Sequence, residues 1–91
     1  MLAVIHTPQL KKDFKKMQKR SLQMTKLTGV MKLIENETEL DDKYRNHILK
    51  GEYNGKSECH IDFDWLLVYE TTQTEVYFIR TGTHSEAVSQ K

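Results

Sequence analysis

The chain has 91 residues, of which 30% are charged and 37% hydrophobic, and its formal net charge is +1. A chain of this length buries roughly 60% of its unfolded surface, which supports one core and excludes a large enclosed site. We therefore expect a single domain over residues 1–91 with a shallow functional site. The N-terminus lacks an apolar signal region and no run approaches membrane-spanning length, so we expect a soluble protein.

A short strand and a first helix are predicted at the start of the chain. Leu2–His6 is an apolar run that ends at Thr7, a favourable N-cap, followed by Pro8 in the first helical turn. Apolar residues then recur on one helical face, with lysines around the rest of the surface. This face comprises Leu10, Phe14 and Met17. The segment is therefore predicted to be an amphipathic helix.

A second helix is predicted after Ser21, which is suited to the N-cap position. Its apolar residues recur at three- and four-residue steps up to about Asn36. They are Met24, Leu27, Met31 and Ile34. Residues 37–42 are acidic and aperiodic, and residues 44–51 have no clear period. We therefore expect irregular chain between this helix and the strands that follow.

Three strands joined by short turns are predicted in the second half. The glycines at positions 51 and 55 mark a turn. Polar and apolar residues alternate over 56–61, residues 65–69 are almost all apolar, and residues 76–80 follow a polar turn at 71–74. With one early strand and two helices, this order predicts an α+β fold, an antiparallel sheet of about four strands with both helices packed on one face.

The register expected for these strands brings several titratable side chains to one end of the sheet. A turn over 71–74 that pairs Tyr69 near Val76 places Trp65 near Arg80. The turn at 62–64 sets His60 beside the start of the central strand. The residues expected to converge are His60, Asp64, Trp65 and Arg80, with His84 just beyond them. Clustered titratable groups are typical of proton-transfer sites.

Charge is distributed unevenly along the chain. The first 34 residues contain eight lysines and arginines and a single acid, whereas residues 35–91 contain six basic and twelve acidic residues. A basic half on a nearly neutral chain predicts a surface that faces phosphate groups. The alternative is a lysine-rich helix face that is only solvated.

Cys59 is the single cysteine, which excludes an intrachain disulfide and a cysteine-based zinc site. This cysteine usage fits a reducing cytoplasm. In the predicted strand Cys59 alternates with His60, so the two side chains lie on opposite faces of the sheet. We interpret Cys59 as a small core residue.

Several short segments resemble the YafQ branch of the RelE superfamily. They are His47–Leu49 leading into Gly51, Gly55-Lys56, His60-Ile61 before Asp64-Trp65, Val68-Tyr69, and Arg80-Thr81-Gly82-Thr83-His84. The similarity extends from about residue 14 onward and is densest between residues 44 and 84. Members of that branch are bacterial type II toxins that cleave messenger RNA in the ribosomal A site and are held inactive by an antitoxin. The resemblance therefore implies a RelE-like microbial RNase fold and that activity.

The resemblance also implies a catalytic set whose chemistry suits RNA cleavage without metal. The set is His47, His60, Asp64, Arg80 and His84. Cleavage requires a base for the 2′-hydroxyl proton, an acid for the departing 5′-oxygen and a cation for the crowded phosphate. Histidines can serve as base and acid near neutral pH, and an arginine matches two phosphate oxygens. Which residue is the base and which the acid stays open.

Contacts with substrate and ribosome are implied as well. Trp65 would be a platform on which an unpaired base stacks, or else part of the core. Val88 stands where related chains tend to carry an aromatic residue that helps hold substrate, and Glu58 replaces a shorter Asp. The residues implied to contact ribosomal RNA are Lys11, Lys12, Lys15, Lys16, Lys19, Arg20 and Lys26.

The partners implied by the resemblance are a cognate antitoxin, DinJ-like or other, together with the ribosome and messenger RNA. No cofactor, metal or membrane is expected in the reaction. The free toxin is expected to be a cytoplasmic monomer.

Two other classes of function stay open at this point. His47, His60, Asp64 and His84 could bind zinc or iron together, although no close His-x-His or His-x-x-x-His spacing supports such a site. Cleavage that persists in excess chelator would exclude it. The basic helices could instead belong to a non-catalytic RNA- or protein-binding module, which predicts an unchanged biological effect when His60 and His84 are replaced by alanine.

Overall fold

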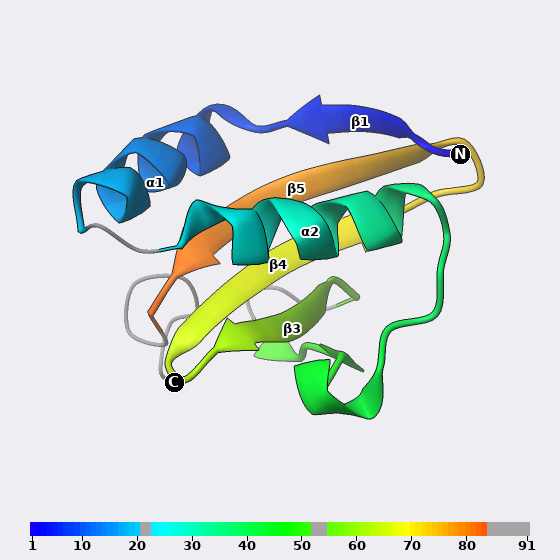
Figure 1. The fold of residues 1–91 in the computed structure, drawn as a ribbon. Coiled ribbons are helices and arrows are strands. Elements are labelled where there is room, and N and C mark those ends of the chain that lie inside the picture. The colour runs from blue at the N-terminus through cyan, green and yellow to red at the C-terminus, as the bar shows by residue number, and fades with distance from the viewer. Residues whose placement is uncertain (21–22, 52–54, 84–91) are drawn as a thin grey trace.

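The fold is a five-stranded sheet with two helices, described by a computed structural model for residues 1–20, 23–51 and 55–83 (Figure 1). The elements in chain order are β1 (Ala3–His6), α1 (Pro8–Lys19), α2 (Met24–Glu35), a 3₁₀ helix η1 (Asp42–Tyr44), β2 (His47–Ile48), β3 (Ser57–Asp62), β4 (Trp65–Thr71) and β5 (Glu75–Gly82). This is the predicted α+β class. In the described part of the chain, no helix is both long and apolar enough to cross a membrane.

The sheet has the strand order β1-β5-β4-β3-β2 and is mostly antiparallel. The expectation of four antiparallel strands needs two corrections. The edge strand β1 runs parallel to β5. A fifth strand, β2, pairs two residues with β3 inside a segment expected to be irregular. Two residues are too few to produce an alternating pattern, so the sequence carried no sign of this strand.

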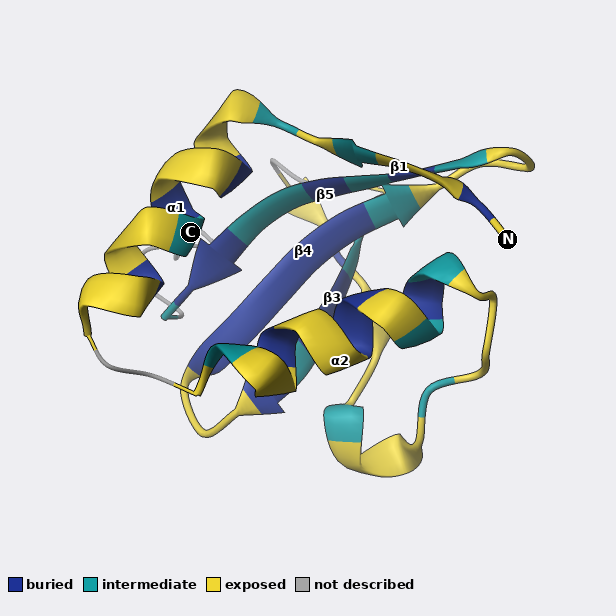
Figure 2. Cartoon of the chain, turned by 45° about the horizontal axis from the view of Figure 1, so that its top comes forward, coloured by how far each residue is buried: buried dark blue, intermediate teal, exposed yellow. Residues whose placement is uncertain are grey.

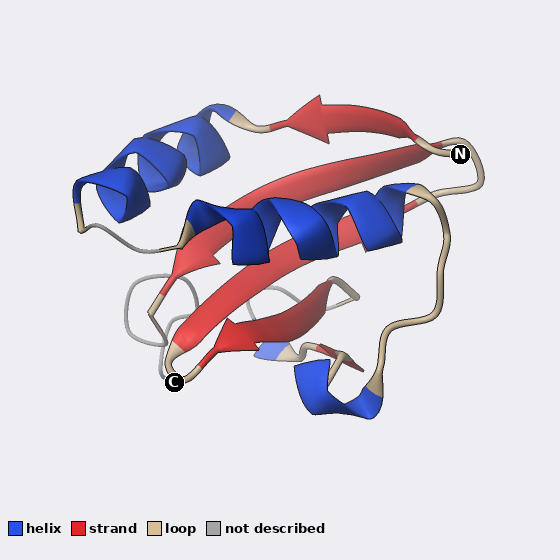
Figure 3. Ribbon diagram, viewed as in Figure 1, coloured by secondary structure: helices blue, strands red, loops and turns tan. Residues whose placement is uncertain are grey.

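Both helices pack on one face of the sheet, as predicted (Figures 2 and 3). Leu10 and Met17 of α1 are buried and Phe14 packs against them, which confirms the predicted apolar face. The core joins these side chains to α2 and to inward-facing residues of β3, β4 and β5. The side chains contributed by α2 are Leu27, Val30, Met31 and Ile34.

The first helix begins at its predicted N-cap, whereas the second begins without a side-chain cap. Thr7 is the N-cap of α1, where its hydroxyl accepts a 3.1 Å hydrogen bond from the Leu10 amide, and Pro8 is the first helical residue. α2 begins at Met24 with Gln23 at its N-cap and without a side-chain cap bond. The predicted cap, Ser21, lies outside the described residues.

Helix α1 covers the part of β5 that lies beyond the short strand β1. The pairing with β1 ends at Phe78, so further along β5 the outward-facing backbone groups need other partners. The Thr7 hydroxyl donates to the Ile79 carbonyl at 2.8 Å, and the Thr81 amide donates to the Asp13 carboxylate at 3.2 Å. Side chains at and near the start of α1 therefore replace a missing strand.

The pairing of β4 with β5 differs from the predicted register. Tyr69 pairs with Phe78, and an irregularity between Val68 and Tyr69 sets Val68 opposite Arg80. The expected pairing of Tyr69 near Val76 and of Trp65 near Arg80 was wrong, because the hairpin continues to Thr71 and β5 contains an extra residue at the bulge. The expected position of His60 is confirmed, since His60 pairs with Leu66 next to the start of β4.

Candidate functional site

Four strands place a row of residues on the sheet face that the helices leave uncovered. His47 of β2 pairs with Glu58 of β3, Glu58 pairs with Val68 of β4, and Val68 pairs with Arg80 of β5. Directly paired residues share a face. Cys59, the neighbour of Glu58, points to the opposite face and is fully buried in the core, as predicted. The row therefore lies on the helix-free face.

A buried carboxylate lies between two imidazoles at the centre of this site. Glu58 is only 4% exposed. Its Oε1 atom is 3.0 Å from Nε2 of His47 and 3.9 Å from Nε2 of His60, and the two imidazole ring centroids are 6.3 Å apart. A buried carboxylate needs such partners, because removing a charge from water without compensation costs several kcal/mol.

His47 contacts an oxygen atom with each of its ring nitrogens. Nδ1 lies 2.7 Å from the carbonyl oxygen of Arg45, and Nε2 lies 3.0 Å from the Glu58 carboxylate. The carbonyl contact fixes the orientation of the ring, so that Nε2 is directed at Glu58.

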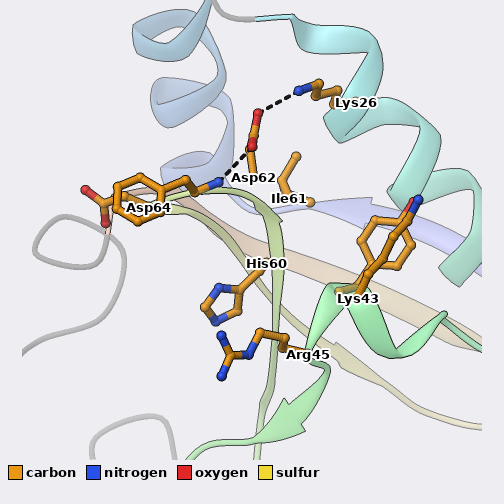
Figure 4. Close-up of a pocket in the computed structure, with 9 residues that line it drawn as sticks. Lys26, Lys43, Arg45, His60, Ile61, Asp62 and Asp64 are labelled. Carbon is orange, nitrogen blue, oxygen red and sulfur yellow. Dashed lines mark hydrogen bonds and ion pairs between the residues drawn. The ribbon is translucent and has the colours of Figure 1, made fainter.

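His60 is partly exposed and lines an open pocket. Its side chain is 22% exposed, and its 3.9 Å separation from Glu58 is too long for a direct hydrogen bond. The ring lines an open pocket of about 740 Å³ formed by β3, the turn after it, η1 and α2. His60 and Arg45 point into the same part of this pocket (Figure 4). The pocket is lined by Lys26, Lys43, Tyr44, Arg45, His60, Ile61, Asp62, Phe63 and Asp64.

Arg80 is held by a carboxylate of α1. Its Nε and Nη2 atoms lie 3.2 Å and 3.3 Å from the two oxygens of Asp13, and the Arg80 side chain is 26% exposed. Asp13 is the one acid among the lysines of the first helix and is 4% exposed. The two-pronged contact fixes the orientation of the guanidinium group.

Asp64 lies in the tight turn between β3 and β4, as expected, and adopts a left-handed backbone with φ of +53°. It lines the pocket with His60, yet Figure 4 shows its carboxylate pointing away from the His60 ring. The carboxylate found between the imidazoles is that of Glu58. One indication of this position was present in the sequence, because Glu58 and His60 are two residues apart in the same strand and so share a face of the sheet.

Trp65 lies in the core. It is 4% exposed, and its indole Nε1–H donates a 3.0 Å hydrogen bond to the Thr81 hydroxyl, which in turn donates to the Leu66 carbonyl at 2.7 Å. The tryptophan packs with the helices in the main hydrophobic cluster. Its burial favours the core interpretation over a stacking platform.

The predicted basic surface is present on α1. Five lysines of the helix are exposed, on the side opposite its buried face, and Arg20, directly after the helix, is exposed as well; the lysines are Lys11, Lys12, Lys15, Lys16 and Lys19. Lys26, on α2, forms a 2.6 Å ion pair with Asp62 through its ammonium group (Figure 4). This ion pair is the main cause of a lowered pKa at Asp62, and the Phe63 amide, which donates to Asp62 at 2.8 Å, adds to the shift.

Two predicted site residues, His84 and Val88, lie outside the described residues. Within the described ranges, no group of three or more histidine, cysteine or acidic side chains is arranged to hold a metal ion. Arg45 and Asp13 were not predicted as site residues. Asp13 did carry a signal, since it shares a helical face with Leu10 and Met17 and so had to be buried.

Comparison with known proteins gives consistent matches over almost the whole chain. Residues 2–89 match the family described as the bacterial toxin of type II toxin-antitoxin systems, YafQ. The mRNA interferase toxin YafQ of Escherichia coli K12 is 40% identical over 81 residues, which cover 88% of each chain.

Solved structures agree with this match. The toxin in the E. coli DinJ-YafQ complex is 36% identical, with a TM-score of 0.85 over 93% of this chain and 96% of that chain. A metal-bound toxin from Helicobacter pylori is 33% identical, with a TM-score of 0.87 over 94% of this chain and 98% of that chain.

Proposed function

The chain belongs to the YafQ family of bacterial type II toxins, and from that premise we propose that it is a messenger-RNA interferase that cuts mRNA in the ribosomal A site. The observation that carries this proposal is the buried Glu58 carboxylate between His47 and His60. Histidines that flank a buried carboxylate beside an open pocket are suited to acid–base catalysis.

His60 takes the first step in the proposed reaction. Its imidazole removes the proton from a ribose 2′-hydroxyl, and the oxygen then attacks the neighbouring phosphorus. The bond from phosphorus to the 5′-oxygen breaks, leaving a 2′,3′-cyclic phosphate on one fragment. Glu58 acts as a positioning residue, because its negative charge stabilises the His60 imidazolium as it forms, and His47 holds the Glu58 carboxylate in place.

The departing 5′-oxygen requires a proton, and we assign this role to His84 on the strength of the sequence resemblance. Arg80 stabilises the negative charge that develops on the phosphate oxygens, with Asp13 holding its guanidinium in place. Asp64 is proposed to act on substrate from the pocket that it shares with His60. Val88 is proposed to contact substrate near His84.

The exposed cations of α1 are proposed to bind ribosomal RNA. Contacts between lysines and phosphates are sequence-independent and weaken steeply with salt. We propose that an antitoxin protein binds the toxin and holds it inactive, by analogy with DinJ in the E. coli complex. We place the free toxin in the cytoplasm as a monomer, where its single buried thiol stays reduced.

The function is tested by inducing the wild type, His60→Ala and the control His6→Ala in bacteria and mapping messenger-RNA ends. His6 is an exposed histidine at the end of β1, far along the chain from the site. We expect wild type and His6→Ala to cut within codons on translating ribosomes, and His60→Ala to lose about 10²- to 10⁴-fold in cleavage.

The same lysates, treated with an excess of a chelator selective for zinc and iron while Mg²⁺ is kept at the level that ribosomes need, test the proposed absence of a metal from the reaction. Cleavage by the wild type should persist. Growth arrest by His60→Ala equal to that of wild type, or transcripts left uncut by the wild type, would contradict the proposed function.

A further inference from the structure

The tip of the turn between β3 and β4 carries an aromatic side chain that the core does not use. Phe63 is 97% exposed, whereas the other described aromatic residues are half-buried or buried. Burying a phenylalanine ordinarily stabilises a protein by roughly 1.5 to 3 kcal/mol, so an exposed one contributes little to folding. A role in stability therefore does not explain this residue.

The turn that carries Phe63 is anchored at its base. The Phe63 amide donates a 2.8 Å hydrogen bond to Asp62 Oδ1, and the other oxygen of Asp62 pairs with Lys26 of α2 at 2.6 Å. The left-handed backbone of Asp64, with φ of +53°, returns the chain directly into β4. An aromatic ring presented from a fixed turn loses little conformational freedom when it binds.

Phe63 also lies at the reaction site, because it lines the same pocket as His60. Charged side chains of both signs line this pocket. Asp62 and Asp64 flank Phe63, with Lys26 paired to Asp62, while Lys43 and Arg45 come from the segment at η1. Carboxylates repel phosphate, so an RNA strand in this pocket would set its phosphate toward Lys43 and Arg45 and a neutral base toward Phe63.

We propose that Phe63 is a substrate-positioning residue on which a base of the messenger RNA, next to the cleaved bond, stacks. This inference rests on the proposed function. Stacking is tolerant of sequence because every base has a π-face, and loss of one such contact weakens binding by about 5- to 150-fold. Phe63 supplies the exposed platform that Trp65, buried beneath the turn, cannot.

The test compares cleavage on purified translating ribosomes by wild type, Phe63→Ala, Phe63→Trp and the control Val4→Ala. Val4 is an exposed apolar residue of β1, the edge strand at the other side of the sheet. We expect Phe63→Ala to raise KM about 5- to 150-fold with a smaller change in kcat. Phe63→Trp should restore cleavage, and Val4→Ala should match wild type.

Two further measurements separate the possible failures. Thermal unfolding of Phe63→Ala should match wild type, since the ring is exposed, and the fluorescence of the new tryptophan in Phe63→Trp should be quenched by a short oligoribonucleotide. Wild-type kinetics for Phe63→Ala would overturn the stacking role while leaving the proposed function intact.

Two further outcomes would overturn the proposed role of Phe63. Absence of cleavage by the wild type would overturn both proposals together. Phe63→Ala that cleaves normally but binds E. coli DinJ more weakly than Val4→Ala does would make Phe63 an antitoxin contact and overturn its assignment to RNA.

Discussion

Two buried carboxylates, Asp13 and Glu58, are each 4% exposed but have different partners. Asp13 accepts hydrogen bonds from the Gln9 amide, from two nitrogens of Arg80 and from the backbone amide of Thr81. These donors keep their protons at any working pH. Glu58 instead faces two imidazoles, at 3.0 Å and 3.9 Å, whose charge depends on pH.

The two carboxylates differ in whether their partners can gain or lose a proton near neutral pH. Asp13 joins α1 to the edge of β5 that β1 leaves unpaired. Its donors, the Arg80 guanidinium and the Thr81 amide, keep their protons throughout the working pH range. The groups around Glu58 can gain or lose a proton, which is what acid–base catalysis uses. Burial alone therefore does not identify a functional carboxylate, whereas the identity of its donors does.

Replacing Glu58 should give the largest effect on activity. Glu58→Gln keeps the shape and removes the charge that stabilises the His60 imidazolium, so we expect cleavage to fall about 100-fold or more. A change in the pH profile of kcat should accompany the loss, because the histidines titrate without the carboxylate.

Glu58→Asp should partly restore cleavage, and the control Glu70→Gln, on the neighbouring strand β4, should cleave like wild type. Normal cleavage rates and an unchanged pH profile for Glu58→Gln would show that the Glu58 charge does not contribute to catalysis.

Replacing Asp13 should instead reduce stability. Asp13→Ala leaves the Thr81 amide and the Arg80 guanidinium without this acceptor, so we expect the free energy of unfolding to fall by about 2 to 4 kcal/mol. Urea denaturation measures this change, with Glu39→Gln, an exposed acid, as the control. A midpoint equal to that of wild type would mean that α1 does not depend on Asp13 to hold β5.

The smallest expected effect on stability near neutral pH comes from the Cys59 thiol, which lies on the core side of β3. Burial, and secondly the charge of Glu58, raise the pKa of the Cys59 thiol from 9.0 to about 12. The folded state therefore keeps the thiol neutral, and its contribution to stability is full below pH 9 and is lost as the pH rises from 9 toward 12.

Alkylation at pH 9 measures the same shift. The folded protein should hold roughly 10³-fold less thiolate than the protein unfolded in guanidinium, so iodoacetamide should react correspondingly more slowly. Equal rates in the two states would show that Cys59 is not shielded as its burial implies.

Local patterns predicted most of the fold. The three- and four-residue spacing from Leu10 to Ile34 predicted both helices, and Thr7 with Pro8 predicted the start of α1. The errors arose where long-range geometry decides. Arg80 lies opposite Val68 and not near Trp65, because the β4–β5 hairpin continues to Thr71 and β5 contains a bulge, and no residue pattern marks a bulge in advance.

The candidate site was predictable in its histidines and less so in its acids. His47 and His60 lie within 6.3 Å of each other, ring centroid to centroid, although they come from different strands. Arg80 forms an ion pair with Asp13, which is 67 residues away along the chain and was not predicted as a site residue. Contacts of that separation depend on how the helices pack, which sequence periodicity does not specify.

The parallel pairing of β1 with β5 has a consequence for the order of folding. Ala3 pairs with Glu75, so within the described residues the first strand finds its sheet partner only after most of the chain has been synthesised. Contacts between distant segments slow folding, because a long loop must close before they stabilise anything. The β5 strand also carries Arg80, so the sheet edge and the proposed site are completed together. The proposed site is therefore incomplete in a nascent chain until β5 has been synthesised.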